Sequence, residues 1–279
     1  KPAEVTGVLS KGEYVMAVEG KRGKMSATTL ISWLNHKARP KDYGFRGSAC
    51  LGGVSVNFSS NIVLGRGRRF AVEADEFDRS FLQLYPTVAV ITSVDPDHLD
   101  IYGDHATMKE AFAQFIAQIL PGGALIIKKD VDVEIRNDQI DVYRYSFDQP
   151  CDFYARNIKL LTGGYYLFDI VCPDRVIEDC TLGIPGWINV ENALAALAAV
   201  WFAGFDEENL KTALADFRGV KRRFEFYINT PELVYMDDYA HHPRELEAAI
   251  TSVKKMFPGR RLTAVFQPHL YTRTRDFYE

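Results

Sequence analysis

Short apolar runs alternate along this chain with a segment of helical spacing, and this alternation constrains the fold more than any other feature. The runs at 70–75 (FAVEAD), 87–94 (TVAVITSV) and 123–129 (GALIIKK) have the composition and length of buried strands. Between the last two lies 105–120 (HATMKEAFAQFIAQIL), whose apolar residues recur every three or four positions. Parallel strands need a crossover of this kind. The sequence therefore predicts an α/β fold with a doubly wound parallel sheet.

The segment 140–182 has a different pattern. Four stretches in it alternate apolar and polar residues, as half-buried strands do. We expect them to form an antiparallel sheet appended to the same domain. An Ala-rich helix at 189–205 and a second helix at 206–217, capped by Asp206, follow this sheet.

The last part of the chain predicts the beginning of a second α/β unit. It has a strand at 233–236, a helix at 243–257 that begins with a proline, and a strand at 261–266. We therefore assign 1–222 to a central domain and 223–279 to the start of a second domain.

The composition excludes several classes of partner. A net charge of −4 gives no electrostatic reason to expect a nucleic acid. No apolar run approaches the roughly 18 residues of a spanning helix, so we expect no membrane insertion. The four cysteines are widely spaced and form no CxxC pair, which favours reduced thiols and a cytoplasmic protein. No pattern predicts an oligomeric state.

A glycine loop follows the first apolar run. The run at 14–18 leads into Gly20, Gly23 and Lys24 and then into a segment that can begin a helix. This order is typical of loops that hold nucleotide phosphates, and it predicts an ATP site of the P-loop type. Met25 stands where such loops carry the hydroxyl that binds magnesium, and Ser26 is the nearest replacement. A tight turn with a solvated lysine is the alternative interpretation.

Acidic residues follow two of the predicted strands. The first stretch contains Glu73 and three more acids, and the second contains His98 among three aspartates. Because the carboxyl ends of parallel strands meet at one edge of a sheet, these side chains predict a magnesium site there. Solvated acidic loops are the alternative.

Seven segments in this order resemble the Mur ligase family: GKRGK, EADEFDRSFL, ITSVDPDHLDIYG, GIPGWINVENALAALAA, FRGVKRRFE, DDYAHHPRE and FQPHLYTRTRDFY. The resemblance implies an ATP-dependent ligase that forms an amide bond through an acyl phosphate. It also implies that the unit beginning at 223 is Rossmann-like and that the family's N-terminal UDP-binding domain is absent from this chain.

The segments DDYAHHP and FQPHLYTRT are the most specific part of the resemblance. They imply that L-alanine is joined to UDP-N-acetylmuramate in peptidoglycan synthesis. Two alternatives stay open. One is a recycling ligase that adds a preformed tripeptide to the same acceptor, and the other is a catalytically impaired nucleotide-binding paralogue.

The resemblance also implies roles for single residues near ATP. Lys24 and the loop backbone would hold the phosphates, while Glu73 and His98 would bind Mg²⁺ or the bridging phosphate. Asn189 and Asn192 would bind adenine, although Asn189 could instead cap its helix. Arg223 would lie at the hinge between the domains, on the phosphate side of ATP.

Further implied positions lie in the second domain. Asp238 would contact the nucleotide, and Tyr239 and His241 would lie at the substrates. His269 and Arg273 would lie near the incoming amino acid.

Three substitutions depart from the family pattern. Met25 replaces the magnesium-binding hydroxyl, Ile188 replaces the histidine before the adenine-binding asparagines, and Leu270 replaces an arginine.

Overall fold

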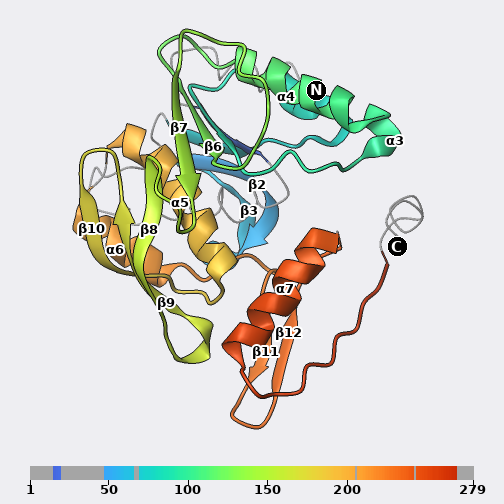
Figure 1. Cartoon of the computed structure of the whole chain (residues 1–279), viewed down its shortest axis with the longest axis vertical. Helices are drawn as coiled ribbons and strands as arrows, with labels where there is room; N and C mark the ends of the chain where they lie inside the picture. The colour runs from blue at the N-terminus through green and yellow to red at the C-terminus, as the bar shows by residue number, and fades with distance from the viewer. Residues whose placement is uncertain (1–14, 20–46, 66–68, 205, 242, 269–279) are drawn as a thin grey trace.

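The computed structural model describes residues 15–19, 47–65, 69–204, 206–241 and 243–268 (Figure 1). Within these residues, ten strands form one mixed sheet in the order β10-β9-β8-β7-β6-β5-β1-β4-β2-β3. The strands are β1 (Val15–Glu19), β2 (Ser48–Ser55), β3 (Ser60–Val63), β4 (Phe70–Glu73), β5 (Val88–Ile91), β6 (Ala124–Lys128), β7 (Asp141–Ser146), β8 (Phe153–Leu160), β9 (Tyr166–Val171) and β10 (Val176–Thr181).

Helices cover both faces of this sheet. On one side lie α5 (Trp187–Ala203) and α6 (Glu207–Asp216); on the other lies α4 (His105–Ala117), with the short elements η1 (Phe77–Gln83) and α3 (Leu99–Tyr102). Alternate residues of β5 show the division, since Val88 and Val90 pack in the core beneath α5 while Ala89 and Ile91 pack in the core beneath α4. The predicted helices at 105–120, 189–205 and 206–217 are confirmed, and Asp206 caps α6 by accepting the N–H of Asn209.

The antiparallel sheet predicted at 140–182 is only partly correct. β8, β9 and β10 pair antiparallel, but β7 runs parallel to both β6 and β8, and all four strands continue the main sheet. Apolar–polar alternation reports which face of a strand is solvated and does not report the direction of its neighbour. Tyr143 of β7 packs against Trp201 and Phe202 of α5, which holds β7 in the main sheet.

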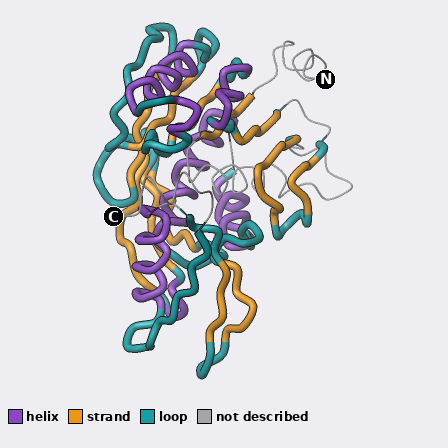
Figure 2. Tube along the Cα trace, turned by 90° about the vertical axis from the view of Figure 1, so that its right-hand side faces the viewer, coloured by secondary structure: helices purple, strands orange, loops and turns teal. Residues whose placement is uncertain are grey.

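A smaller unit follows residue 222. β11 (Glu225–Asn229) and β12 (Val234–Asp237) form an antiparallel pair, which projects away from the large sheet (Figure 2). The helix α7 (Pro243–Met256) confirms the helix predicted at 243–257. Its Met256 packs on Gly164 of the short turn η2 (Thr162–Gly164), where a Cβ would lie 2.9 Å from the Met256 Cβ.

The strand predicted at 261–266 is wrong. This segment is extended but pairs with no strand in the described residues, and it runs alone beyond α7 (Figure 1). Val265 is 96% exposed and Phe266 is 51% exposed. Apolar composition predicts a strand only where a neighbouring backbone is available for hydrogen bonds.

None of the helices in the described residues combines the length and hydrophobicity that crossing a membrane requires. All four cysteines lie in the described part and carry free thiols.

Candidate functional site

The candidate site lies where β4, β1 and β5 end. These strands are parallel neighbours, with Val18 opposite Glu73 and Glu19 opposite Ile91. The strand that leads into the glycine loop therefore ends between the two strands that lead into the acidic segments. In open α/β sheets this carboxyl edge is where ligands bind.

Glu76, Asp97 and His98 converge at this edge, and we call them the sheet-edge cluster. The His98 Nε2 atom lies 3.7 Å from Glu76 Oε1 and 3.7 Å from Asp97 Oδ2. One ligand atom from each residue lies within 4.8 Å of the other two. Asp97 is 3% exposed, and His98 and Glu76 are half-buried. Two carboxylates and an imidazole are thus held together in a partly desolvated place.

Local backbone geometry brings these three residues together. His98 adopts a left-handed conformation (φ 51°) immediately before α3, and its N–H donates to Asp97 Oδ1 at 2.9 Å. The Tyr102 hydroxyl of α3 donates to the Glu76 carbonyl at 2.6 Å, and the Phe77 ring contacts the His98 ring edge-on. A non-glycine residue in the left-handed conformation raises the free energy of the folded state by about 1–3 kcal/mol, so these contacts must offset that strain.

The donor set of the sheet-edge cluster fits a divalent cation. Magnesium prefers oxygen ligands, which Glu76 and Asp97 supply, and imidazole is a common further metal ligand. Glu76 and Asp97 belong to the predicted acidic stretches but were not singled out there. Their position in the segments that follow β4 and β5, the two strands on either side of β1, was the available signal.

Glu73 has a different surrounding. Its Oε2 accepts the N–H of Gly52 at 2.7 Å, and a Cβ on Gly52 would lie 2.8 Å from the Glu73 carboxylate carbon. Glu73 is not a member of the sheet-edge cluster, and its role as a metal ligand stays a prediction. Gly52 lies on β2, a strand that the sequence did not predict.

Asn189 and Asn192 lie in the first two turns of α5 and are 3% and 5% exposed. The capping alternative for Asn189 is wrong, because Gly186 is the N-cap and the Asn189 amide donates back to the Pro185 carbonyl at 2.6 Å. Between the asparagines, Glu191 lies 3.3 Å from Lys128 at the end of β6. This ion pair ties the start of α5 to the carboxyl edge of the sheet.

The predicted residues of the second unit also gather. Arg223 lies over the Tyr239 ring, 5.8 Å from its centroid. Asp238 accepts the N–H of Phe224 at 3.0 Å and that of Ala240 at 2.8 Å. Burial raises the pKa of the Asp238 carboxyl, although the charge of Arg223 and these N–H groups oppose that rise.

His241 joins the same group through Glu245, which sequence reasoning missed. The Glu245 carboxylate lies 3.5 Å from His241 Nδ1 and 3.6 Å from Arg223 Nη1. Its place in the first turn of α7 was the available signal, since acids are common there.

Several predicted site residues lie outside the described residues, and their roles stay predictions. They are Gly20, Gly23, Lys24 and Ser26 of the glycine loop, and His269 and Arg273 near the end of the chain.

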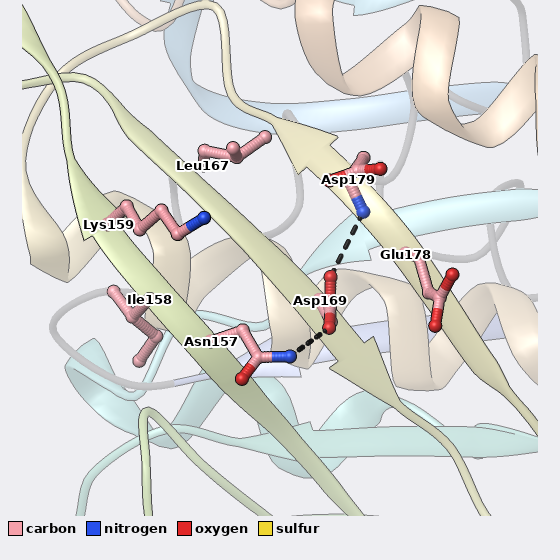
Figure 3. A pocket seen from close by; sticks show the side chains of 7 residues that line it. All are labelled: Asn157, Ile158, Lys159, Leu167, Asp169, Glu178 and Asp179. Atoms are coloured by element: carbon pink, nitrogen blue, oxygen red, sulfur yellow. Dashed lines mark hydrogen bonds between the residues drawn. The ribbon is translucent and has the colours of Figure 1, made fainter.

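A separate pocket of about 400 Å³ lies on β8, β9 and β10 (Figure 3). Asp169 occupies its centre, with its carboxylate accepting the Asn157 amide at 2.6 Å and the Asp179 N–H at 3.1 Å. Asn157 and Asp179 are left-handed and lie where the pairing with β9 shifts register on each side. We call Asn157, Asp169 and Asp179 the bulge cluster, because the Asp169 carboxylate joins two strand irregularities.

Comparison with known proteins identifies both parts of the chain. The Mur ligase middle domain matches residues 20–200, and the Mur ligase, glutamate ligase domain matches residues 222–279. The chain is 46% identical over 279 residues to the UDP-N-acetylmuramate–L-alanine ligase of Parabacteroides distasonis, covering 99% of this chain and 59% of that protein. It is 42% identical to the ligase of the same name from Phocaeicola vulgatus, covering 100% of this chain and 60% of the relative.

Solved structures agree on the fold. The UDP-N-acetylmuramate-alanine ligase of Thermotoga maritima matches 96% of this chain and 60% of its own length, with a TM-score of 0.78 and 24% identity. A murein peptide ligase from Psychrobacter arcticus also matches 96% of this chain and 60% of its own length, with a TM-score of 0.68 and 24% identity. This chain thus spans about 60% of the length of the curated relatives named above. It belongs to the Mur ligase family.

Proposed function

We propose that this chain forms the ATP-binding part of a cytoplasmic ligase that joins L-alanine to the carboxylate of UDP-N-acetylmuramate. The names of the relatives at 46% and 42% identity support this substrate pair. In this proposal, 1–222 is the central ATP-binding domain of the P-loop type. Residues 223–279 belong to a Rossmann-like C-terminal domain.

The observation that carries the proposal is the sheet-edge cluster beside the end of β1. Phosphoryl transfer needs concentrated positive charge around the transferring oxygens and little covalent help from the protein. A bound Mg²⁺ supplies part of that charge. Glu76, Asp97 and His98 would hold it, with Glu73 as a further predicted ligand.

The reaction moves the terminal phosphoryl group of ATP to the muramate carboxylate and releases ADP. The amine of L-alanine then attacks the acyl phosphate, an amide bond forms, and inorganic phosphate leaves. Lys24 binds the ATP phosphates, and Arg223 stabilises the charge on the transferring group. Asn189 and Asn192 bind adenine.

The remaining predicted residues position the other groups. Asp238 contacts the nucleotide from the second domain, and Tyr239 and His241 lie beside the substrates. His269 and Arg273 hold the carboxylate of the amino acid, since arginine binds carboxylates through two parallel hydrogen bonds.

The test is a coupled assay of ADP release by the complete protein with ATP, Mg²⁺ and UDP-N-acetylmuramate. We expect ADP release only when L-alanine is present, together with an equal amount of the amide product. Release with a preformed tripeptide instead of L-alanine would assign the recycling reaction. ATP binding without any acceptor-dependent release would assign an impaired paralogue.

A further inference from the structure

Glu245 contacts two of the basic side chains that the proposed function uses. Its Oε1 lies 3.6 Å from Arg223 Nη1, and its Oε2 lies 3.5 Å from His241 Nδ1. Oε2 also accepts the backbone N–H of His241 at 3.1 Å. A single carboxylate therefore joins the linker after the first domain to the loop that precedes α7.

Burial makes these contacts more than a surface ion pair. The side chains of Glu245, Arg223 and His241 are 9%, 15% and 16% exposed. Exposed pairs are worth little because water screens them and both side chains lose rotamer freedom. Here water is largely excluded, so removing the carboxylate leaves a partly buried guanidinium without this counter-charge.

The surrounding contacts restrict the linker further. The Tyr239 N–H donates to the Arg222 carbonyl at 2.8 Å, and the Arg222 guanidinium lies 4.9 Å from the Tyr239 ring centroid. Asp238 accepts the Phe224 N–H. The backbone on both sides of Arg223 is thus held against 238–241, and Glu245 adds the contact to the Arg223 head group itself.

A purely local role for Glu245 is the competing explanation. An acid in the first turn of a helix interacts favourably with the helix dipole, typically by about 0.3–1 kcal/mol. That role needs neither Arg223 nor His241. Glu247, two residues further along α7, is exposed and offers a matched acid on the same helix.

We propose that Glu245 is a positioning residue, which holds the Arg223 guanidinium in the arrangement that acts on ATP. The His241 imidazole has a closer partner, because its Nδ1 lies 2.9 Å from the Tyr239 carbonyl oxygen. This inference rests on the proposed function of Arg223. It assigns to Glu245 no contact with a substrate.

The test compares Glu245→Gln, Glu245→Asp and the control Glu247→Gln in the complete protein. ADP release at saturating L-alanine and UDP-N-acetylmuramate gives kcat and KM for ATP, and thermal unfolding gives Tm. We expect Glu245→Gln to lower kcat/KM for ATP by about 10- to 100-fold, the usual range for a residue that orients a ligand-binding group. Glu245→Asp recovers most of this loss when both variants are assayed well below their Tm, and Glu247→Gln matches the wild type.

A double-mutant cycle with Arg223→Ala shows whether Glu245 acts through the arginine. We expect Glu245→Gln to cause no further loss in the Arg223→Ala protein. An equal loss in both backgrounds, kinetics like those of Glu247→Gln, or a loss that follows Tm and is not recovered by aspartate would each overturn the inference.

Failure of the proposed function has a different signature. A wild-type protein that releases no ADP in response to L-alanine or tripeptide contradicts the ligase assignment. The Glu245 variants are then compared by calorimetric titration with ATP. Weaker ATP binding for Glu245→Gln but not for Glu247→Gln supports the positioning role, and equal binding rejects it.

Discussion

The sheet-edge cluster and the bulge cluster both gather acidic side chains on one sheet, yet the two clusters arrange their side chains differently. At Asp169 the neighbours are donors: the Asn157 amide at 2.6 Å, the Asp179 N–H at 3.1 Å, and Arg156 Nε at 3.5 Å. At the sheet edge, the Glu76 and Asp97 carboxylates and the His98 imidazole turn their ligand atoms toward one another.

The difference separates a structural carboxylate from a binding one. An acid surrounded by donors has its charge satisfied within the fold, and it stabilises the backbone that supplies the donors. Acids and an imidazole that face one another stabilise a cation brought from outside. The residue types alone do not distinguish the two cases, whereas the convergence of the three ligand atoms does.

The largest expected effect tests the binding side of this comparison. Asp97→Asn keeps the shape of the side chain but removes its charge, so ATP turnover falls by about 100-fold or more, or ~2.7 kcal/mol in the activation free energy. The steady-state rate of ADP release measures this loss of turnover. Asp100→Asn is the control, because Asp100 is an exposed acid three residues further on. Equal rates of ADP release for the two variants would show that Asp97 takes no part in ATP turnover.

The second effect tests the structural side. Asp169→Asn turns one accepting oxygen into a donor that faces other donors, so the free energy of unfolding falls by about 1–3 kcal/mol. The kcat of the folded enzyme stays at the wild-type value. Chemical denaturation measures the stability, with Glu178→Gln as a control from the rim of the same pocket. A loss of kcat in Asp169→Asn at unchanged stability would reverse the assignment of this cluster.

A third prediction concerns Glu73, whose carboxylate accepts the Gly52 N–H near the sheet edge. Gly52→Ala places a methyl group against that carboxylate and displaces it. We expect about a tenfold loss in kcat/KM for ATP, as for other changes beside a ligand-binding group. Glu73→Gln should show a loss of the same order. Wild-type kinetics for both variants would show that Glu73 takes no part in ATP turnover.

The smallest effect is the pH dependence of the bulge cluster. Burial alone would raise the pKa of Asp169, but its hydrogen bonds and the charge of Arg156 outweigh burial and hold the pKa below its usual range. A depressed pKa contributes stability above the unfolded value of about 3.9, and this contribution is lost as the pH falls through the native pKa. The stability difference between wild type and Asp169→Asn should therefore narrow below about pH 4. A stability difference between the two proteins that stays constant from pH 7 to pH 3 would contradict this prediction.

Local patterns predicted much of the fold because they act locally. The periodicity of 105–120 and the apolar runs of β4, β5 and β6 are properties of single segments, and the structure confirms them. The direction of β7, and the lack of a strand partner for 261–266 among the described residues, depend on neighbours, which no single segment encodes. β2 escaped prediction because Gly52 and Gly53 interrupt its apolar pattern.

At the sheet edge, the sequence predicted the two segments that meet and named His98, but it did not single out Glu76 or Asp97. Position after parallel strands of one sheet indicated that the acidic stretches would meet. Which carboxylates converge depends on left-handed residues at Asp78, Arg79 and His98, whose conformations the sequence does not reveal. Glu245 lies far along the chain from the acidic stretches, and only the packing of α7 shows its contacts.

The central claim is that the sheet-edge cluster, and not the bulge cluster, binds the divalent cation. Manganese carries an anomalous X-ray signal and accepts the same oxygen ligands as magnesium. The direct measurement is therefore anomalous diffraction from crystals of the complete protein with Mn²⁺ and a non-hydrolysable ATP analogue. We predict a peak at bonding distance from at least two of Glu76, Asp97 and His98, and none at Asp169. A peak at Asp169, or nucleotide density with no peak at the sheet-edge cluster, would contradict the claim.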